Sequence, residues 1–241
     1  MTLEKIHELT SMGVGDASDM KTYPESWVKI YFKSYPRFRK IDLPEPNKIS
    51  SSLYDLLLKR SSKRDFVDKA ITLSDLSDLL FYSSGIINKD SIESLDDSRR
   101  AYPSAGGRFP IEIYLSIHNC EGVDAGVYHY NVISHKLELL ILGDQTKELL
   151  YFIDQKMILN ASVLFMISSP YKRTQVKYGL RAYRYIHLDA GHLAQNMYLV
   201  AENLGIGCCT IGGFTDDKIN EFFDFPEDEK MIYLGVLGKY D

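Results

Sequence analysis

At 241 residues the chain has room for one compact enzyme domain, and a chain of this length folds without disulfide or metal cross-links. Its content of 45% hydrophobic and 25% charged residues excludes a disordered or fibrous protein. The net charge of −5 argues against a nucleic-acid partner, because such binding depends on basic residues that neutralise phosphates. No apolar run approaches the roughly 18 residues of a membrane helix, and the N-terminus lacks a signal-peptide core. A cytoplasmic protein without membrane association is therefore expected.

The first 46 residues are expected to form an aromatic arm that packs on the remainder, residues 47–241, which would form a single domain. Residues 1–22 have the pattern of a short amphipathic segment followed by a Gly/Ser/Asp turn. Residues 23–40 interleave aromatic and basic side chains, and the prolines in 41–46 favour an extended backbone. The aromatic residues of the arm are Tyr23, Trp27, Tyr31, Phe32, Tyr35 and Phe38.

Hydrophobic periodicity and turn residues predict the elements of the body. Ser74 is the expected cap of the second helix, and Leu53, Leu56 and Leu57 fall on one face of the first. Short connections between the first three strands are typical of antiparallel hairpins. Helices are predicted at 52–60, 73–82, 145–158 and 216–223, and strands at 111–118, 126–130, 137–142, 161–168, 207–214 and 231–237.

The strongest helical pattern extends from about Thr174 to Leu204. Its apolar positions recur at steps of three or four, as on a buried helix face, and Gly205 is expected to end the helix. The residues of this face are Leu180, Tyr183, His187, Ala190, Ala194, Met197, Ala201 and Leu204. These elements together predict an α+β fold in which a central, mostly antiparallel sheet is flanked by helices, one of them long.

Several common kinds of site are absent from the sequence. Cys120, Cys208 and Cys209 have neither disulfide nor metal-ligand spacing, and the adjacent pair is expected to be buried as small apolar residues. His187 and His192 are five residues apart and diverge on a helix, so no metal site is predicted. There is no P-loop, no His-Glu-x-x-His and no Gly-x-Ser-x-Gly motif.

A basic segment, Arg60-Ser61-Ser62-Lys63-Arg64, lies at the end of the first predicted body helix. Guanidinium groups present a planar set of donors that matches phosphate oxygens, and hydroxyls add further donors. The segment therefore suits a phosphate dianion. A solvated basic turn is the alternative that the residues alone leave open.

A glycine-containing loop, Pro103-Ser104-Ala105-Gly106-Gly107, precedes the first predicted body strand. Adjacent glycines allow the backbone to approach a flat ligand closely, and backbone amides there can donate hydrogen bonds to ring heteroatoms. A mobile loop before a strand is the alternative.

Lys177 and Tyr178 lie near the start of the long predicted helix, where side chains can reach a cleft. A lysine acts as a base near neutral pH when burial and neighbouring cations lower its pKa. Arg181, one helical turn further on, would act on Lys177 in that direction. A surface Lys–Tyr pair is the alternative.

Taken together, these segments resemble the nitroreductase superfamily of FMN flavoproteins, and most closely its SagB-type branch, the azoline dehydrogenases of peptide biosynthesis. Arg60, Ser62 and Arg64 match an Arg-x-Ser-x-Arg-x-Phe phosphate segment. The resemblance runs from about Leu43 to the C-terminus. It further rests on Pro103–Gly107, Lys177-Tyr178, Gly191-His192-x-x-Gln195-Asn196 and Gly212-Gly213-Phe214.

The resemblance implies a nitroreductase-like fold and a homodimer with FMN at the subunit interface. Lys177 and Tyr178 would be the catalytic proton-transfer pair. Ser61 stands where a second arginine is common, and Asp189 where a glutamate is common. The residues implied to bind FMN are Arg60, Ser61, Ser62, Arg64, Pro103, Ser104, Ala105, Gly106, Gly107, Gln195, Gly212, Gly213 and Lys239.

The implied reaction oxidises thiazoline or oxazoline rings of a peptide to thiazoles or oxazoles. A base removes one ring proton, a hydride passes to the flavin, and dioxygen reoxidises the flavin. A cyclodehydratase, which makes the ring, is the implied partner protein. Two alternatives stay open: an NAD(P)H-dependent nitro- or quinone reductase, and a catalytically silent subunit of a peptide-modifying complex.

Overall fold

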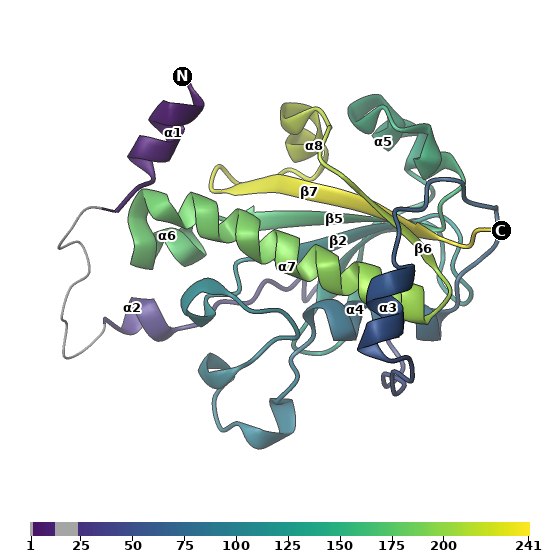
Figure 1. Ribbon diagram of the computed structural model, residues 1–241, viewed down its shortest axis with the longest axis horizontal. Helices are drawn as coiled ribbons and strands as arrows, with labels where there is room; N and C mark the ends of the chain where they lie inside the picture. Colours follow the sequence, from purple (N-terminus) through teal and green to yellow (C-terminus); the bar gives the residue numbers. More distant parts are fainter. Residues whose placement is uncertain (1, 13–23) are drawn as a thin grey trace.

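The computed structural model describes residues 2–12 and 24–241. Tyr23 and the turn expected before it lie outside these residues. Seven strands form one antiparallel sheet in the order β1-β4-β3-β2-β5-β7-β6 (Figure 1). The strands are β1 (Lys40–Asp42), β2 (Glu112–Ile117), β3 (Gly126–Asn131), β4 (Lys136–Leu142), β5 (Val163–Pro170), β6 (Gly207–Ile211) and β7 (Glu229–Gly238).

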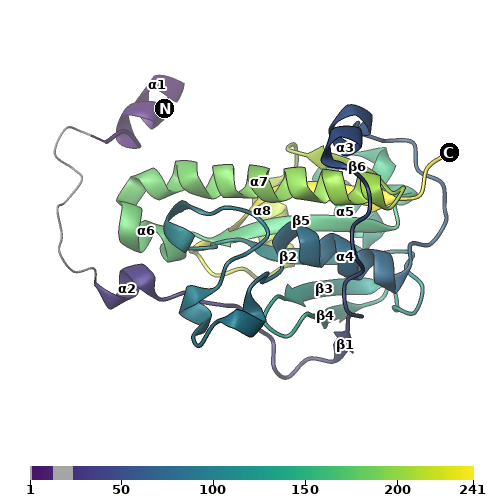
Figure 2. The same ribbon diagram turned by 60° about the horizontal axis from the view of Figure 1, so that its bottom comes forward.

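Helices cover both faces of the sheet (Figures 1 and 2). One core includes side chains of α4 and α7, and the other includes side chains of α5 and α8, which lie on the opposite face. The helices are α1 (Leu3–Leu9), α2 (Glu25–Val28), α3 (Leu53–Lys59), α4 (Leu73–Ser84), α5 (Thr146–Ile153), α6 (Lys172–Tyr178), α7 (Ala182–Asn203) and α8 (Asp216–Phe222). The predicted α+β fold with a central antiparallel sheet is confirmed. In the described part of the chain, no helix has the length and apolar character needed to cross a bilayer.

The helix ends follow from local sequence. Thr72, and not Ser74 as expected, caps α4, because its side chain accepts the amide of Asp75 and the Asp75 carboxylate accepts the amide of Thr72. Gly205, with φ of +62°, ends α7 as expected. The amide of Ile206 donates to the Ala201 carbonyl at 2.9 Å, which gives the hydrogen-bonded C-terminal turn that a glycine in this conformation allows.

The long predicted helix is divided into α6 and α7. Gly179 lies between them with φ of +53° and ψ of −138°, a conformation that interrupts the helical backbone and that other residues rarely adopt. Lys177 and Tyr178 therefore end a short helix and do not begin a long one. Arg181 is not on the next turn of the same helix, and its Nη1 donates to the carbonyl of Thr10 at 3.2 Å.

Two predicted apolar faces are only partly buried. Ala190, Ala194, Met197 and Ala201 of α7 are buried, but Leu180, Tyr183 and His187 are exposed, and the buried positions of the first turns of α7 are Ala182 and Ile186. In α3, Leu56 is buried whereas Leu53 and Leu57 are exposed. The adjacent cysteines Cys208 and Cys209 are buried and free, as expected.

The segment before α3 runs across the sheet and joins its edge. Leu137 pairs with Ile41 through β1, which the sequence pattern indicated only as extended backbone. Lys33 and Tyr35 insert their side chains among charged residues of the sheet, and Lys33 Nζ lies 2.5 Å from a carboxylate oxygen of Glu229. Residues 30–43 thus contribute buried groups to the core, including Ile30 and Leu43.

Candidate functional site

The basic segment after α3 runs beside the beginning of strand β6. The amide of Lys63 donates to the carbonyl of Cys208 at 3.0 Å, and Ser62 forms a parallel bridge with the same residue. Arg60 caps the C-terminal end of α3, and its guanidinium lies over the ring of Tyr198, 5.4 Å from the ring centroid. Ser61 and Arg64 are exposed. The segment therefore presents two guanidinium groups and hydroxyls at the C-terminal end of α7.

Tyr198 of α7 organises this region, and it belongs to none of the sequence motifs. Its hydroxyl lies 3.1 Å from Ser62 Oγ and accepts the amide of Thr210 at 2.9 Å. Tyr233 donates to Thr210 Oγ1 at 2.7 Å. These bonds fix Ser62 relative to β6 and β7. The only sequence signal was the high tyrosine count, which does not identify a position.

Lys239 reaches the same region through its backbone, whereas its side chain points to α4. The carbonyl of Lys239 accepts the amide of Val67 at 2.9 Å. Its ammonium lies 3.5 Å from the carboxylate of Asp75. The ion pair holds the Lys239 ammonium at the cap of α4, so the main cationic groups of the basic segment are Arg60, Lys63 and Arg64.

Asp189 of α7 fixes the glycine-containing loop. Its carboxylate accepts Ser104 Oγ at 2.5 Å and the amide of Ala105 at 3.3 Å, and Ser104 Oγ also accepts the amide of Phe109 at 2.9 Å. Burial raises the pKa of Asp189 to about 6, against the lowering effect of the bonds from Ser104 and Ala105. The loop is therefore tied to α7 at its beginning, while Pro103 is exposed.

Gly106 brings this loop against the candidate proton-transfer pair. It has φ of +60°, and a Cβ there would fall 3.0 Å from Lys177 Nζ and still closer to the Tyr178 hydroxyl. A Cβ on the neighbouring Gly107, with φ of +65°, would meet nothing within 4 Å. Only a glycine at 106 leaves room for the two side chains beside the loop.

Lys177 and Tyr178 have different surroundings. The Lys177 ammonium lies 5.6 Å from the centroid of the Tyr178 ring, and both side chains are half-buried. Burial is the main cause that raises the pKa of Tyr178, and the neighbouring Tyr185 acts in the same direction. Tyr178 therefore stays protonated at neutral pH and can donate a hydrogen bond.

The remaining candidates lie on the surface of the single chain. Gln195 of α7, Gly212 and Gly213 are exposed, and the two glycines follow directly after β6. The basic segment contacts α7 at Tyr198, and the loop contacts it at Asp189. These positions are nine residues apart, about 14 Å along a helix axis. A ligand with a phosphate at one end and a flat ring at the other could bridge such a span.

A model of the nitroreductase family matches residues 57–239, which include the basic segment, the loop, the Lys–Tyr pair and both glycine positions after β6. The chain belongs to the nitroreductase family. MJ1384 of Methanocaldococcus jannaschii, a protein assigned to the nitroreductases, is 35% identical over 189 residues, covering 78% of this chain and 91% of MJ1384.

Two further relatives are longer than this chain. The microcin B17-processing protein McbC of Escherichia coli is 26% identical over 178 residues, covering 70% of this chain and 65% of McbC. A solved structure assigned to the nitroreductases, from Anabaena variabilis, is 28% identical with a TM-score of 0.79 and covers 99% of this chain. The chain spans just under two thirds of McbC and 47% of the Anabaena protein.

Proposed function

We propose that the protein is an FMN-dependent oxidase that converts thiazoline or oxazoline rings of a peptide into thiazoles or oxazoles, as in the SagB-type branch. The observation that carries this proposal is the position of Lys177 and Tyr178 against the backbone of Gly106. Reduction of nitro groups or quinones by a nicotinamide cofactor needs no amine and phenol beside the ring-binding loop. Ring oxidation needs a group that removes a carbon-bound proton.

The residues present fit FMN. Arg60, Ser62 and Arg64 have the donor chemistry of a phosphate site. The loop leaves backbone accessible at Gly107, where a Cβ would meet nothing within 4 Å, and Gly106 next to it carries the contact with Lys177 and Tyr178. The chemistry that FMN supplies when bound is acceptance of two electrons, which dioxygen then takes up. Gln195, Gly212, Gly213 and Lys239 complete the proposed FMN-binding set, together with Ser61 and Pro103–Ala105.

In this proposal Lys177 removes the ring proton. Tyr178 donates a hydrogen bond that orients either the nitrogen of the substrate ring or the side-chain amine of Lys177. The raised pKa of Tyr178 keeps its phenol protonated for that role. Gly106 lets both side chains stand beside the loop, and Asp189 holds the loop still through Ser104. Positioning of the base against a fixed ring supplies a large part of the acceleration in such reactions.

The relatives support a peptide substrate. McbC is named for processing microcin B17, and it is 26% identical to this chain over 178 residues. On this basis we propose a cyclodehydratase as the partner that makes the ring. We also propose a homodimer with FMN at its interface, because Arg64, Gln195 and Gly212 are exposed in the single chain.

The division into an arm of residues 1–46 and a domain of residues 47–241 is part of the proposal. Lys33 neutralises the buried carboxylate of Glu229, so deletion of residues 1–40 should lower the melting temperature and cause aggregation. Deletion of residues 1–12 is the control, because among the described residues of this segment only Thr10, which binds Arg181 and Arg184, is buried, and the loss should be smaller. Equal stability of both truncated proteins would contradict the packing of the arm.

The proposed function is tested by incubating flavin-loaded protein with a thiazoline-containing peptide in air and measuring the peptide mass. The expected product has lost two hydrogens, and Lys177→Ala should abolish its formation while flavin stays bound. Lys172→Ala is the matched control, since this exposed lysine lies on the same helix. A wild-type protein that retains flavin but leaves the peptide mass unchanged would refute the proposal.

A further inference from the structure

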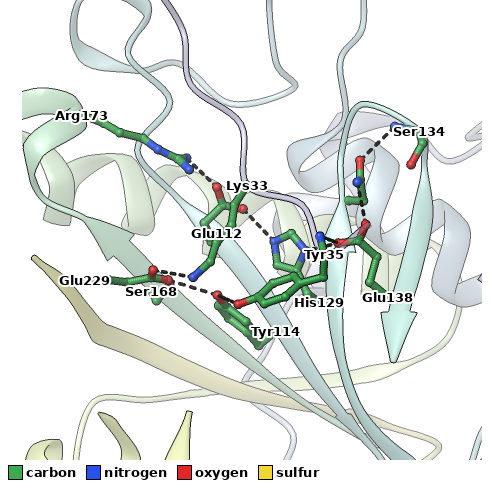
Figure 3. A network of polar contacts seen from close by, with 11 residues as sticks. Lys33, Tyr35, Glu112, Tyr114, His129, Ser134, Glu138, Ser168, Arg173 and Glu229 are labelled. Atoms are coloured by element: carbon green, nitrogen blue, oxygen red, sulfur yellow. Dashed lines mark hydrogen bonds and ion pairs between the residues drawn. The ribbon is translucent and has the colours of Figure 1, made fainter. Parts of the chain in front are cut away.

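A row of charged side chains crosses the sheet under the N-terminal segment (Figure 3). His129 of β3 lies between two carboxylates, with Nε2 at 2.9 Å from Glu112 of β2 and Nδ1 at 2.9 Å from Glu138 of β4. All three are buried. The hydrogen bonds to Glu112 and Glu138 raise the pKa of His129 despite the opposing effect of burial, so the imidazole carries a positive charge between two negative ones.

The row ends on the helix that carries the candidate proton-transfer pair. Arg173 of α6 has its Nη1 2.5 Å from Glu112 Oε1, and its side chain is 10% exposed. Arg173 is one helical turn before Lys177, on the same side of α6. In Figure 3 the guanidinium of Arg173 reaches down from α6 to the Glu112 carboxylate, which faces His129 on its other side.

A second contact fixes the same turn of α6. Arg108, two residues after Gly106, donates through Nε to the carbonyl of Arg173 at 2.7 Å. In an α-helix that carbonyl is the acceptor for the amide of Lys177. Arg108 is 1% exposed and also donates to the carbonyl of Trp27 at 2.9 Å. The stretch from the loop to the start of β2 therefore holds α6 through Arg108 and Glu112.

We propose that Glu112 and Arg173 are positioning residues for catalysis: their buried ion pair fixes α6 so that Lys177 and Tyr178 stand against Gly106. This inference rests on the proposed function for its kinetic part only. The network has a second branch around Glu229, whose carboxylate is equally buried. Its side-chain contacts are Lys33, Tyr114 and Ser168, and none of these residues lies on α6. A comparison of substitutions at Glu112 and at Glu229 therefore distinguishes loss of α6 positioning from general destabilisation of the fold.

Removal of Glu112 or Arg173 should release α6 without opening the proposed flavin site. Arg173→Gln leaves Glu112 with His129 as a partner, so the protein should still fold. Displacement of a catalytic group by about 1 Å costs on the order of a hundredfold in rate. We expect kcat for ring oxidation to fall tenfold or more in Glu112→Gln and Arg173→Gln, with KM and flavin content unchanged. Arg173→Lys, which keeps the charge, should recover most of kcat.

Hydrogen exchange provides a readout that does not need activity. The amides of residues 172–178 should exchange faster in Glu112→Gln and Arg173→Gln than in the wild type, and at the wild-type rate in Lys172→Gln and Glu229→Gln. Lys172 is the control for loss of a charge on α6, since its side chain is 77% exposed and lies 3.8 Å from Asp228. Glu229→Gln controls for the loss of a buried carboxylate and should lower the melting temperature with little change in kcat.

The inference would be overturned if, in Arg173→Gln, the amides of α6 exchanged at the wild-type rate and kcat also stayed at the wild-type value. A fall of kcat in Glu229→Gln as large as in Glu112→Gln would also overturn it, because general destabilisation would then explain both. If Arg173→Gln does not fold, the comparison of Arg173→Lys and Glu112→Gln decides the question in the same way. A wild-type protein without peptide turnover would refute the proposed function, and the exchange of α6 would still test the positioning.

Discussion

The Tyr178 hydroxyl and the Lys177 ammonium occupy the space that a side chain at position 106 would need, so both groups lie directly beside the backbone of Gly106. This relationship joins two segments more than 70 residues apart in the chain. It depends on the positive φ of Gly106 and on the hydrogen bonds from the preceding Ser104 and Ala105 to Asp189. The loop and the end of α6 therefore act as one unit.

Alanine at position 106 should disturb this unit more than alanine at position 107. Both glycines have a positive φ, so each substitution strains the backbone by about 1 kcal/mol. Only the Cβ at 106 would collide with Tyr178 and Lys177. Gly106→Ala should therefore lower turnover tenfold or more, whereas Gly107→Ala should lose stability but keep most of its turnover. Equal turnover in the two variants, measured at equal flavin content, would contradict the close approach.

Asp189 should make stability depend on pH in the acidic range. Its pKa is raised to about 6 in the folded protein, from an ordinary value of 3.8, so the folded state binds the proton more tightly. The stabilising effect is full below about pH 4 and is lost as the pH rises through 6. The stability of the wild type relative to Asp189→Asn should fall by roughly 2.4 kcal/mol between pH 4 and 7. Urea unfolding at several pH values measures this, and a difference that stays constant would refute it.

His129 should also make the stability of the folded protein fall as the pH rises, but in a higher pH range than Asp189. Its pKa is raised, so its charged contacts with Glu112 and Glu138 contribute fully below about 6.5 and are lost as the pH rises through the raised value. The stability of the wild type relative to His129→Gln should therefore be greatest at pH 6.5 and below, and smaller at alkaline pH. A difference that grows with pH would show that the imidazole is neutral between the two carboxylates.

Arg64 should matter for retention of FMN and little for folding. Its side chain is exposed, and a hydrogen bond to a charged phosphate contributes about 1.5 to 3 kcal/mol. Arg64→Ala should weaken FMN binding tenfold or more, as measured by equilibrium dialysis. Arg37→Ala, an exposed arginine of the arm, is the matched control and should bind FMN as the wild type does. Unchanged flavin affinity in Arg64→Ala would remove this residue from the phosphate site.

Local sequence predicted the elements of this fold but not the contacts between distant ones. The end of α7 at Gly205 was evident because the signal is contained in neighbouring residues. The break at Gly179 was not, since apolar positions continue through Leu180 and Tyr183 and a lone glycine is tolerated within helices. Sequence motifs singled out the Lys–Tyr pair and the loop, but their meeting depends on tertiary packing.

The charged row behind the site could not be predicted for the same reason. Glu112, His129 and Glu138 come from three strands, and they align only in the register in which His129 pairs with Glu138 and Tyr114 with His129. Nothing within any one strand indicates the pairing of a histidine with two distant carboxylates. Arg173 directly precedes the helix predicted from about Thr174, and none of the motifs includes it.

In the proposed function a ring-containing peptide, and not a nicotinamide, reduces the bound flavin. The most direct measurement mixes flavin-loaded protein anaerobically with a thiazoline peptide or with NADPH and follows the flavin absorbance. We expect rapid bleaching by the peptide, loss of this bleaching in Lys177→Ala, and slow or no bleaching by NADPH. Rapid bleaching by NADPH with no response to the peptide would refute the ring oxidation and indicate a nitro- or quinone reductase.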